Sequence, residues 1–181
     1  EVQREQRQHR FVNLRTIEHA TSTETDRNPR HDSYLRSQSR KLTAEIAENA
    51  EEKNLYINSL TEKIIGLAIK VHRTLGPGFL ESVYQAALAY ELGKAGIPFE
   101  KEMGLPVAYQ DILLEVGFRC DFLVDKRVIV ECKSVKEITP LDHAQLLNYL
   151  KITNLTVGLL LNFNVRKLTD GIQRIVNNFH E

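Results

Sequence analysis

The stretch CDFLVDKRVIVECKSV, residues 120–135, decides the fold because it has the pattern of two strands joined by a tight turn. The second strand, residues 128–135, begins with three consecutive apolar residues, which is typical of a strand in the middle of a sheet. Side chains of a strand alternate between its two faces, so Glu131 and Lys133 share one face and Cys132 lies on the other. A charged pair on a central strand is costly to bury unless something compensates it, and the pattern therefore indicates a functional site.

The length of the turn decides whether Asp121 joins this site. With a loop over residues 125–127, an odd number, Asp121 lies directly opposite Glu131, and their Cβ atoms are about 5 Å apart. A two-residue loop would turn Asp121 to the other face of the sheet. We therefore predict the odd-length loop, with Cys120 and Cys132 facing each other on the side of the core.

The residues on both sides of this hairpin predict further helices and strands. Apolar residues recur at three- and four-residue steps over residues 55–75, which predicts an amphipathic helix that ends at Gly76. Helices are expected over residues 55–75, 80–94, 140–152 and 168–179. Strands are expected as an antiparallel meander of short runs and one run buried on both faces, over residues 97–102, 105–109, 112–116, 118–124, 128–135 and 155–163. This order predicts an α/β (α+β) fold with a central mixed β-sheet flanked by α-helices.

The polar N-terminal part of the chain is expected to be a separate region. Residues 1–53 are rich in Arg, Gln, Glu, Thr and Ser and contain few apolar residues. Such a segment cannot bury enough surface to offset the entropy lost on ordering it. We expect residues 1–40 to be disordered or loosely helical, residues 43–53 to form a short helix, and residues 54–181 to form the folded domain.

Bulk composition excludes several classes of protein but does not identify a function. The 24 Lys and Arg residues balance the 24 Asp and Glu residues, whereas a protein that binds nucleic acid by non-specific attraction is usually basic. Two cysteines are too few for a disulfide framework or a zinc site and are typical of reduced thiols. No apolar run reaches the roughly 18 residues of a membrane span. We therefore expect a cytoplasmic protein with no membrane segment, whose function depends on a specific site.

A divalent metal ion would explain why two carboxylates lie side by side. Asp121 and Glu131 would repel each other at this distance, and one of them would be driven to its neutral form. Mg²⁺ (or Mn²⁺) removes this repulsion because such hard cations prefer carboxylate oxygens. The metal can polarise a phosphodiester and activate a bound water, and Lys133 can orient that water or stabilise the developing charge. A lone E-x-K pattern is more often an ordinary surface pair, so this prediction needs support from elsewhere in the chain.

Two helices supply that support. In GFLESVY, Glu81 and Tyr84 are three residues apart and share a helix face, and in HAQLLNYL, Gln145 and Tyr149 are four apart and do the same. Each pair alone more often consists of solvent-exposed polar residues without a function, or of a tyrosine and its hydrogen-bond partner. Their order along the chain, with the Asp strand and the E-x-K strand between the two helices, favours a shared site.

In that order, the motifs resemble a known family. GFLESVY is similar to the GxxExxY signature of a prokaryotic protein family within the PD-(D/E)XK nuclease superfamily, and the resemblance covers residues 55–179. It implies a restriction-endonuclease-like core and a metal-dependent nuclease that hydrolyses phosphodiester bonds in nucleic acid. DNA is the nucleic acid that we expect. Cys120 stands where the superfamily has the proline of its name. The resemblance implies these catalytic residues and metal ligands: Asp121, Glu131, Lys133, Glu81 and the main-chain carbonyl of Cys132.

The resemblance also implies residues that bind the nucleic-acid strand. Gln145 and Tyr149 are similar to the QxxxY motif of the recombination-type exonucleases in this superfamily, and Tyr84 is expected to act with them. His72 and His143 are more typical of ordinary helix histidines. Several basic residues could contact phosphates near the site, although most of them are expected to be ordinary surface charges: Arg119, Lys126, Arg127, Lys136, Lys151, Arg166 and Lys167.

Three functions are compatible with these patterns. The first is a Mg²⁺-dependent nuclease in DNA repair, recombination or defence, and the presence of Asp121, Glu131 and Lys133 together favours it. The second is a non-catalytic module that binds nucleic acid or protein on a nuclease fold. The third is a structural protein in which the carboxylates only form ion pairs. A protein partner or a homo-oligomer is compatible with each of them.

Overall fold

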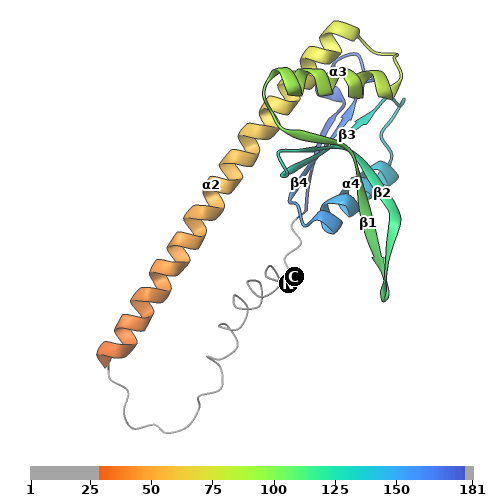
Figure 1. Cartoon of the computed structure of the whole chain (residues 1–181). Helices are drawn as coiled ribbons and strands as arrows, with labels where there is room; N and C mark the ends of the chain where they lie inside the picture. Colours follow the sequence, from red (N-terminus) through yellow and green to blue (C-terminus); the bar gives the residue numbers. More distant parts are fainter. Residues whose placement is uncertain (1–28, 178–181) are drawn as a thin grey trace. The chain divides into compact units, whose positions relative to one another are not determined.

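The computed structural model describes residues 29–177 of the chain (Figure 1). Its contacts divide the chain into two units, which meet between Asn49 and Ala50 inside a long helix, and the second unit contains the whole sheet. The elements in chain order are α2 (Pro29–Leu75), α3 (Glu81–Lys94), β1 (Phe99–Tyr109), β2 (Ile112–Val124), β3 (Val128–Lys133), α4 (Pro140–Thr153), β4 (Val157–Asn162), η1 (Leu168–Asp170) and β5 (Ile172–Val176).

The second unit is built on one five-stranded sheet. Its strands lie in the order β1-β2-β3-β4-β5, with β3 and β4 parallel and every other neighbouring pair antiparallel. The parallel pair is joined by α4, as a crossover between parallel strands requires. The expected mixed sheet flanked by helices is therefore confirmed, and β3 and β4 are its central strands.

Each face of the sheet is covered by its own hydrophobic cluster. Residues of α2 and α3 pack against one face, where Val130 and Leu159 are fully buried. Residues of α4 pack against the other face, where Ile129 and Leu160 are fully buried. Neighbouring residues of one strand thus serve opposite clusters, which is why β3 and β4 are apolar at nearly every position.

The N-terminal helix is longer than the sequence predicted. In place of a short helix over residues 43–53 and another from residue 55, α2 runs without interruption from Pro29 to Leu75. No glycine or proline lies between Pro29 and Gly66, and most residues there are good helix formers, so nothing ends the helix. The predictions for residues 1–28 lie outside the described residues, and a boundary near residue 53 stays a prediction.

Two further predictions were wrong. Residues 168–179 were expected to form a helix, but the chain makes one turn at η1 and then forms β5, which pairs with β4. Gly171 and the β-branched residues after it favour a strand, and the strand satisfies the open edge of β4. The four short runs before β3 merge into two long strands, because β1 continues through Pro106 by a change of register between Leu105 and Val107.

Candidate active site

The β2–β3 hairpin brings the two predicted carboxylates together. Val124 pairs with Val128, so the loop covers residues 125–127, and the predicted odd length is confirmed. Phe122 pairs with Val130, and the same register places Asp121 opposite Glu131 at the next position. The loop backbone suits this connection because Asp125 and Lys126 both adopt positive φ, 50° and 53°, as in the primed turns that match the twist of a hairpin.

At the site itself the carboxylates join the two strands. The Asp121 N–H donates to Glu131 Oε1 at 3.1 Å, and the Cys132 N–H donates to Asp121 Oδ2 at 2.8 Å. Each acid therefore accepts a hydrogen bond from a backbone N–H of the other strand, beyond the last paired residues of the two strands. The acidic residues hold the hairpin together at the place where the backbone ladder ends.

The two cysteines do not face each other, which corrects the prediction from strict alternation. Cys132 is buried on the face covered by α2 and α3, whereas Cys120 is buried on the face covered by α4. The backbone pairing between β2 and β3 ends at Phe122, so no pairing with β3 fixes the face on which the Cys120 side chain lies. On its other side Cys120 pairs with Met103 of the neighbouring strand β1, and Met103 follows Glu102, which has a positive φ of 52°.

Lys133 lies at the end of β3 and is held by α4. Its Nζ donates to Gln145 Oε1 at 3.3 Å and lies 3.6 Å from Asp142 Oδ1. Asp142 also forms the capping box of α4 with Thr139, so the acid that pairs with the lysine is itself fixed at the start of the helix. The sequence did not predict the contact of Asp142 with Lys133; the three-residue spacing between Asp142 and Gln145, which puts them on one helix face, was the available signal.

Glu81, in the first turn of α3, lies in the electrostatic field of the same site. Burial raises the pKa of its carboxyl, while the charge of Lys133 and a backbone hydrogen bond from Ser134 lower it, and the charge of Asp121 raises it. The Ser134 hydroxyl donates to the Phe79 carbonyl at 2.7 Å and ties the loop before α3 to the end of β3. This contact brings the helical glutamate toward the strand that carries the lysine.

Gln85 is a site residue that the sequence prediction missed. Burial raises the pKa of Asp121, whereas hydrogen bonds from the Cys132 N–H and from the Gln85 side chain lower it. Gln85 follows Glu81 by four residues, so both lie on the same face of α3 and point toward the strands. That spacing could have identified it, but glutamines at such positions are common on helix surfaces.

Among Asp121, Glu131 and Glu81, the carboxyl group of Glu131 has the most strongly shifted pKa. Its side chain is buried with 4% exposure, and burial together with the charge of Asp121 raises its pKa to about 8. The Asp121 N–H and Lys133 oppose this shift without cancelling it. Two close carboxylates that cannot both ionise cheaply leave one proton bound near neutral pH, as the sequence argument expected.

The oxygen donors of the site suit a hard cation, although the acidic side chains are not gathered around one point. Within residues 29–177, no three His, Cys, Asp or Glu side chains are placed to hold a metal ion together. Asp121 and Glu131 instead direct oxygens toward backbone N–H groups. Burial is the main cause that raises the pKa values of Asp121, Glu131 and Glu81, and a divalent cation would favour the charged form of such carboxyl groups.

Tyr84 and Tyr149 are both buried. The Tyr84 hydroxyl donates to the Gly76 carbonyl at 2.7 Å and accepts from the Phe79 N–H at 3.1 Å. These bonds close the turn in which Gly76 and Gly78 adopt positive φ, so the tyrosine of the GFLESVY segment stabilises the turn before Glu81. Contact of Tyr84 with nucleic acid stays a prediction.

Tyr149 links α4 to the strand that carries Asp121. Its hydroxyl donates to the Arg119 carbonyl at 3.3 Å, and its side chain also forms a hydrogen bond with Gln145. Burial and the nearby Glu131 raise the pKa of the phenol well above its usual value. Gln145 and Tyr149 thus lie beside the lysine and the acids, and their binding to a nucleic-acid strand stays a prediction.

A mixed sheet with helices on both faces, carrying acids on a hairpin and a lysine at its end, is the architecture of a restriction-endonuclease-like core. A family model described as the PD-(D/E)XK nuclease superfamily matches residues 58–175, more than half of the chain. The chain belongs to the PD-(D/E)XK nuclease superfamily. Membership indicates a nuclease, a hydrolase that acts on nucleic acid, and nucleases of this superfamily typically use divalent metals.

The other comparisons add no named relative. No curated protein and no solved structure gave a significant match to the chain. Across residues 29–177, no helix is both long enough and apolar enough to cross a membrane.

Proposed function

We propose that this protein is a metal-dependent nuclease of the GxxExxY type that hydrolyses phosphodiester bonds in DNA. The observation that carries the proposal is the contact of Asp121 and Glu131 across the β2–β3 hairpin, two residues before Lys133. The perturbed pKa of Glu131 supports it, because strongly shifted groups gather at functional sites. A role in DNA repair or in defence within a prokaryotic cytoplasm is the setting we propose.

Four groups would hold the cation, Mg²⁺ or Mn²⁺: the carboxylates of Asp121, Glu131 and Glu81 and the main-chain carbonyl of Cys132. When bound, such a cation polarises the phosphodiester and lowers the pKa of a bound water. The Asp121 carboxylate accepts hydrogen bonds from the Cys132 N–H and from Gln85, so binding of the cation would have to share or displace these bonds.

Lys133 contributes a positive charge that the fold holds in place. Its Nζ is restrained by Gln145 and Asp142, and its side chain is 16% exposed, so the ammonium loses little freedom when the substrate arrives. In the proposed reaction it orients the attacking water or stabilises negative charge on the phosphate as the new oxygen–phosphorus bond forms and the ester bond breaks. Gln145 and Tyr149, on the same helix, are proposed to contact the strand beside the scissile phosphate.

A cleavage assay tests this function. Linear and circular DNA, single- and double-stranded, are incubated with the protein in Mg²⁺ or Mn²⁺ and in EDTA. We expect cleavage only with metal, loss of cleavage in Lys133→Ala, and unchanged cleavage in the control Lys94→Ala, which removes an exposed lysine at the end of α3. Cleavage by Lys133→Ala at the parent rate would refute the proposed site.

A second function, a nucleic-acid- or protein-binding module that does not cleave, has one observation in its favour. The oxygens of Asp121 and Glu131 that accept backbone N–H groups serve the hairpin itself, and a degenerate domain could retain the acids for that reason. The same assay separates the two functions. Metal-dependent DNA binding without cleavage of any of the four DNA forms would favour the module.

A further inference from the structure

A group of basic side chains outside the candidate active site surrounds a pocket at the same end of the sheet. Strand β3 ends at Lys133, which pairs with Asn162 at the end of the parallel strand β4. The chain then leaves the sheet into the loop before η1, and a pocket of about 540 Å³ lies between this loop and the end of α2. Its cationic lining residues are Arg73, Arg166 and Lys167.

These three cations have no carboxylate partner in the described part of the chain. All three are exposed, and none forms an ion pair with a carboxylate within residues 29–177. Like charges around one pocket repel each other, and an anion bound among them removes that repulsion. The local excess of positive charge contrasts with the zero net charge of the chain, so it is a property of this pocket and not of the composition.

The loop that carries two of the cations is fixed to the candidate active site. The Phe163 N–H donates to the Lys133 carbonyl at 2.8 Å, and the Phe163 ring stacks on Tyr84 at 4.5 Å between centroids. Two residues further on, the Val165 carbonyl lies 2.9 Å from Nε2 of His72, a buried residue of α2. These contacts anchor the backbone next to Arg166 to the strand that carries the lysine of the site, so the position of the loop relative to that lysine is fixed.

We propose that Arg73, Arg166 and Lys167 bind backbone phosphates of the nucleic-acid strand outside the scissile position and set where the strand enters the site. The inference rests on the proposed nuclease function for the identity of its ligand. Arginine offers a planar fork that matches phosphate oxygens, and lysine offers a compact charge. Contacts of this kind position a strand without reading its sequence.

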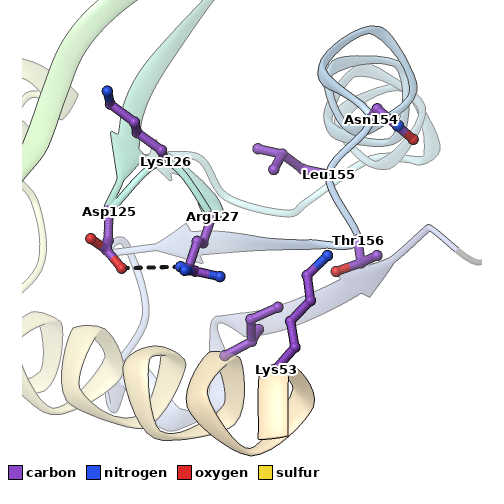
Figure 2. Close-up of a pocket in the computed structure, with 8 residues that line it drawn as sticks. Lys53, Asp125, Lys126, Arg127, Asn154, Leu155 and Thr156 are labelled. Atoms are coloured by element: carbon purple, nitrogen blue, oxygen red, sulfur yellow. Dashed lines mark ion pairs between the residues drawn. The ribbon is translucent and has the colours of Figure 1, made fainter. Parts of the chain in front are cut away.

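A second basic pocket provides a matched comparison. Figure 2 shows a pocket of about 400 Å³ lined by Lys53, Lys126 and Arg127 at the opposite end of β3, where the strand begins at Val128. There Arg127 is paired with Asp125 at 3.4 Å, the contact drawn as a dashed line in Figure 2. Lys126 and Lys167 are both exposed lysines that line a pocket, but only Lys167 lies at the end of the sheet that carries Lys133.

The test measures DNA affinity as a function of salt. A fluorescent duplex is titrated by anisotropy with Mg²⁺ present, in a Lys133→Ala background that keeps the DNA intact, and Arg166→Gln, Lys167→Gln and the control Lys126→Gln are compared. Each of the first two is expected to weaken binding several-fold and to reduce the slope of log K against log salt by about 0.9, the value for one lost phosphate contact. Lys126→Gln is expected to keep the affinity and slope of its background, and thermal unfolding verifies that each variant is folded.

The outcomes separate this inference from the proposed function. Parental affinity and slope in both Arg166→Gln and Lys167→Gln overturn the pocket, even where the parent protein cleaves DNA with metal. Weaker binding in these variants with no cleavage by the parent supports the pocket and overturns the nuclease. Absence of any DNA binding overturns both.

Discussion

The two ends of the β2–β3 hairpin are built in opposite ways. Near the loop, Phe122 faces Val130 and Val124 faces Val128, all of them fully buried and joined by regular backbone pairing. At the other end the paired ladder stops, and the carboxylates of Asp121 and Glu131 accept the backbone N–H groups. The first end contributes stability through burial, whereas the second keeps perturbed acids in place at some cost in stability. The difference shows how one hairpin can be both scaffold and site.

Removing a large side chain from the scaffold end should have the largest effect. Phe122 is fully buried and packs edge-to-face against Phe99 at 5.7 Å between ring centroids. Phe122→Ala is expected to lower the free energy of unfolding by about 3–5 kcal/mol, because it loses buried area and leaves a cavity. Urea denaturation measures this, and a loss below about 1 kcal/mol would mean that the scaffold end contributes no more than a surface position.

Replacing an acid at the site end should raise the free energy of unfolding at neutral and alkaline pH, whereas Phe122→Ala lowers it. The pKa of Glu131 in the folded protein is raised to about 8, so the folded state holds a proton that the unfolded state releases near its ordinary pKa. The contribution of Glu131 to the stability of the metal-free protein therefore falls as pH rises from about 4.5 to 8 and changes little above that. Glu131→Gln should remove this part of the dependence and raise stability at pH 8, on the order of a few kcal/mol.

Urea denaturation of the parent and of Glu131→Gln, at pH 5 and pH 8 in EDTA, gives the measurement. Asp121 and Glu81 also have raised pKa values, so the stability of the Glu131→Gln variant should still depend on pH to some extent. The difference between the two proteins isolates Glu131. An identical change in stability from pH 5 to pH 8 in both proteins would contradict the proposed proton on Glu131.

The turn before α3 should show an intermediate effect. Tyr84→Phe removes the hydroxyl that donates to the Gly76 carbonyl and accepts from the Phe79 N–H, so both backbone groups lose this hydrogen-bond partner. A loss of about 1–3 kcal/mol in the free energy of unfolding is expected. Thermal unfolding measures it, and a variant as stable as the parent but with weaker DNA binding would instead favour the predicted contact with nucleic acid.

The start of α4 should show the smallest change in stability and separates two roles of one residue. Asp142→Asn weakens the capping box and removes the ion pair with Lys133, whereas Thr139→Ala weakens only the cap. Both should lose about 1 kcal/mol of stability. If Asp142 positions Lys133, only Asp142→Asn should also slow cleavage, and equal cleavage rates in the two variants would assign Asp142 to the cap alone.

Much of the site could be predicted because its information is local. The alternation of a strand places Glu131 and Lys133 on one face, and the odd loop places Asp121 opposite Glu131; both follow from a few consecutive residues. Strand β4 was expected to be buried on both faces because it is almost entirely apolar, and its six residues are buried. Patterns of this kind depend on the chain's own period and not on what packs against it.

The errors lie where distant parts of the chain decide the outcome. β5 was predicted as a helix, and it is a strand because the edge of β4 was open to pair with it. The Cys120 side chain lies on the opposite face of the sheet from Cys132, against the strict alternation of a strand, because the backbone pairing of β2 with β3 ends at Phe122. Each of these depends on a neighbouring strand that the local sequence does not contain.

By itself, the sequence determined the elements of the core hairpin, the pair of acids and the lysine at its end, because strand period and loop length act within 13 consecutive residues, Asp121 to Lys133. Only the tertiary structure decided which groups surround them. Gln85 from α3 reaches Asp121, and Asp142 from α4 reaches Lys133, because the two helices pack on opposite faces of the sheet and extend to the end of β3. Packing of this kind is set by the burial of apolar surface between segments far apart in the chain, and no local pattern records it.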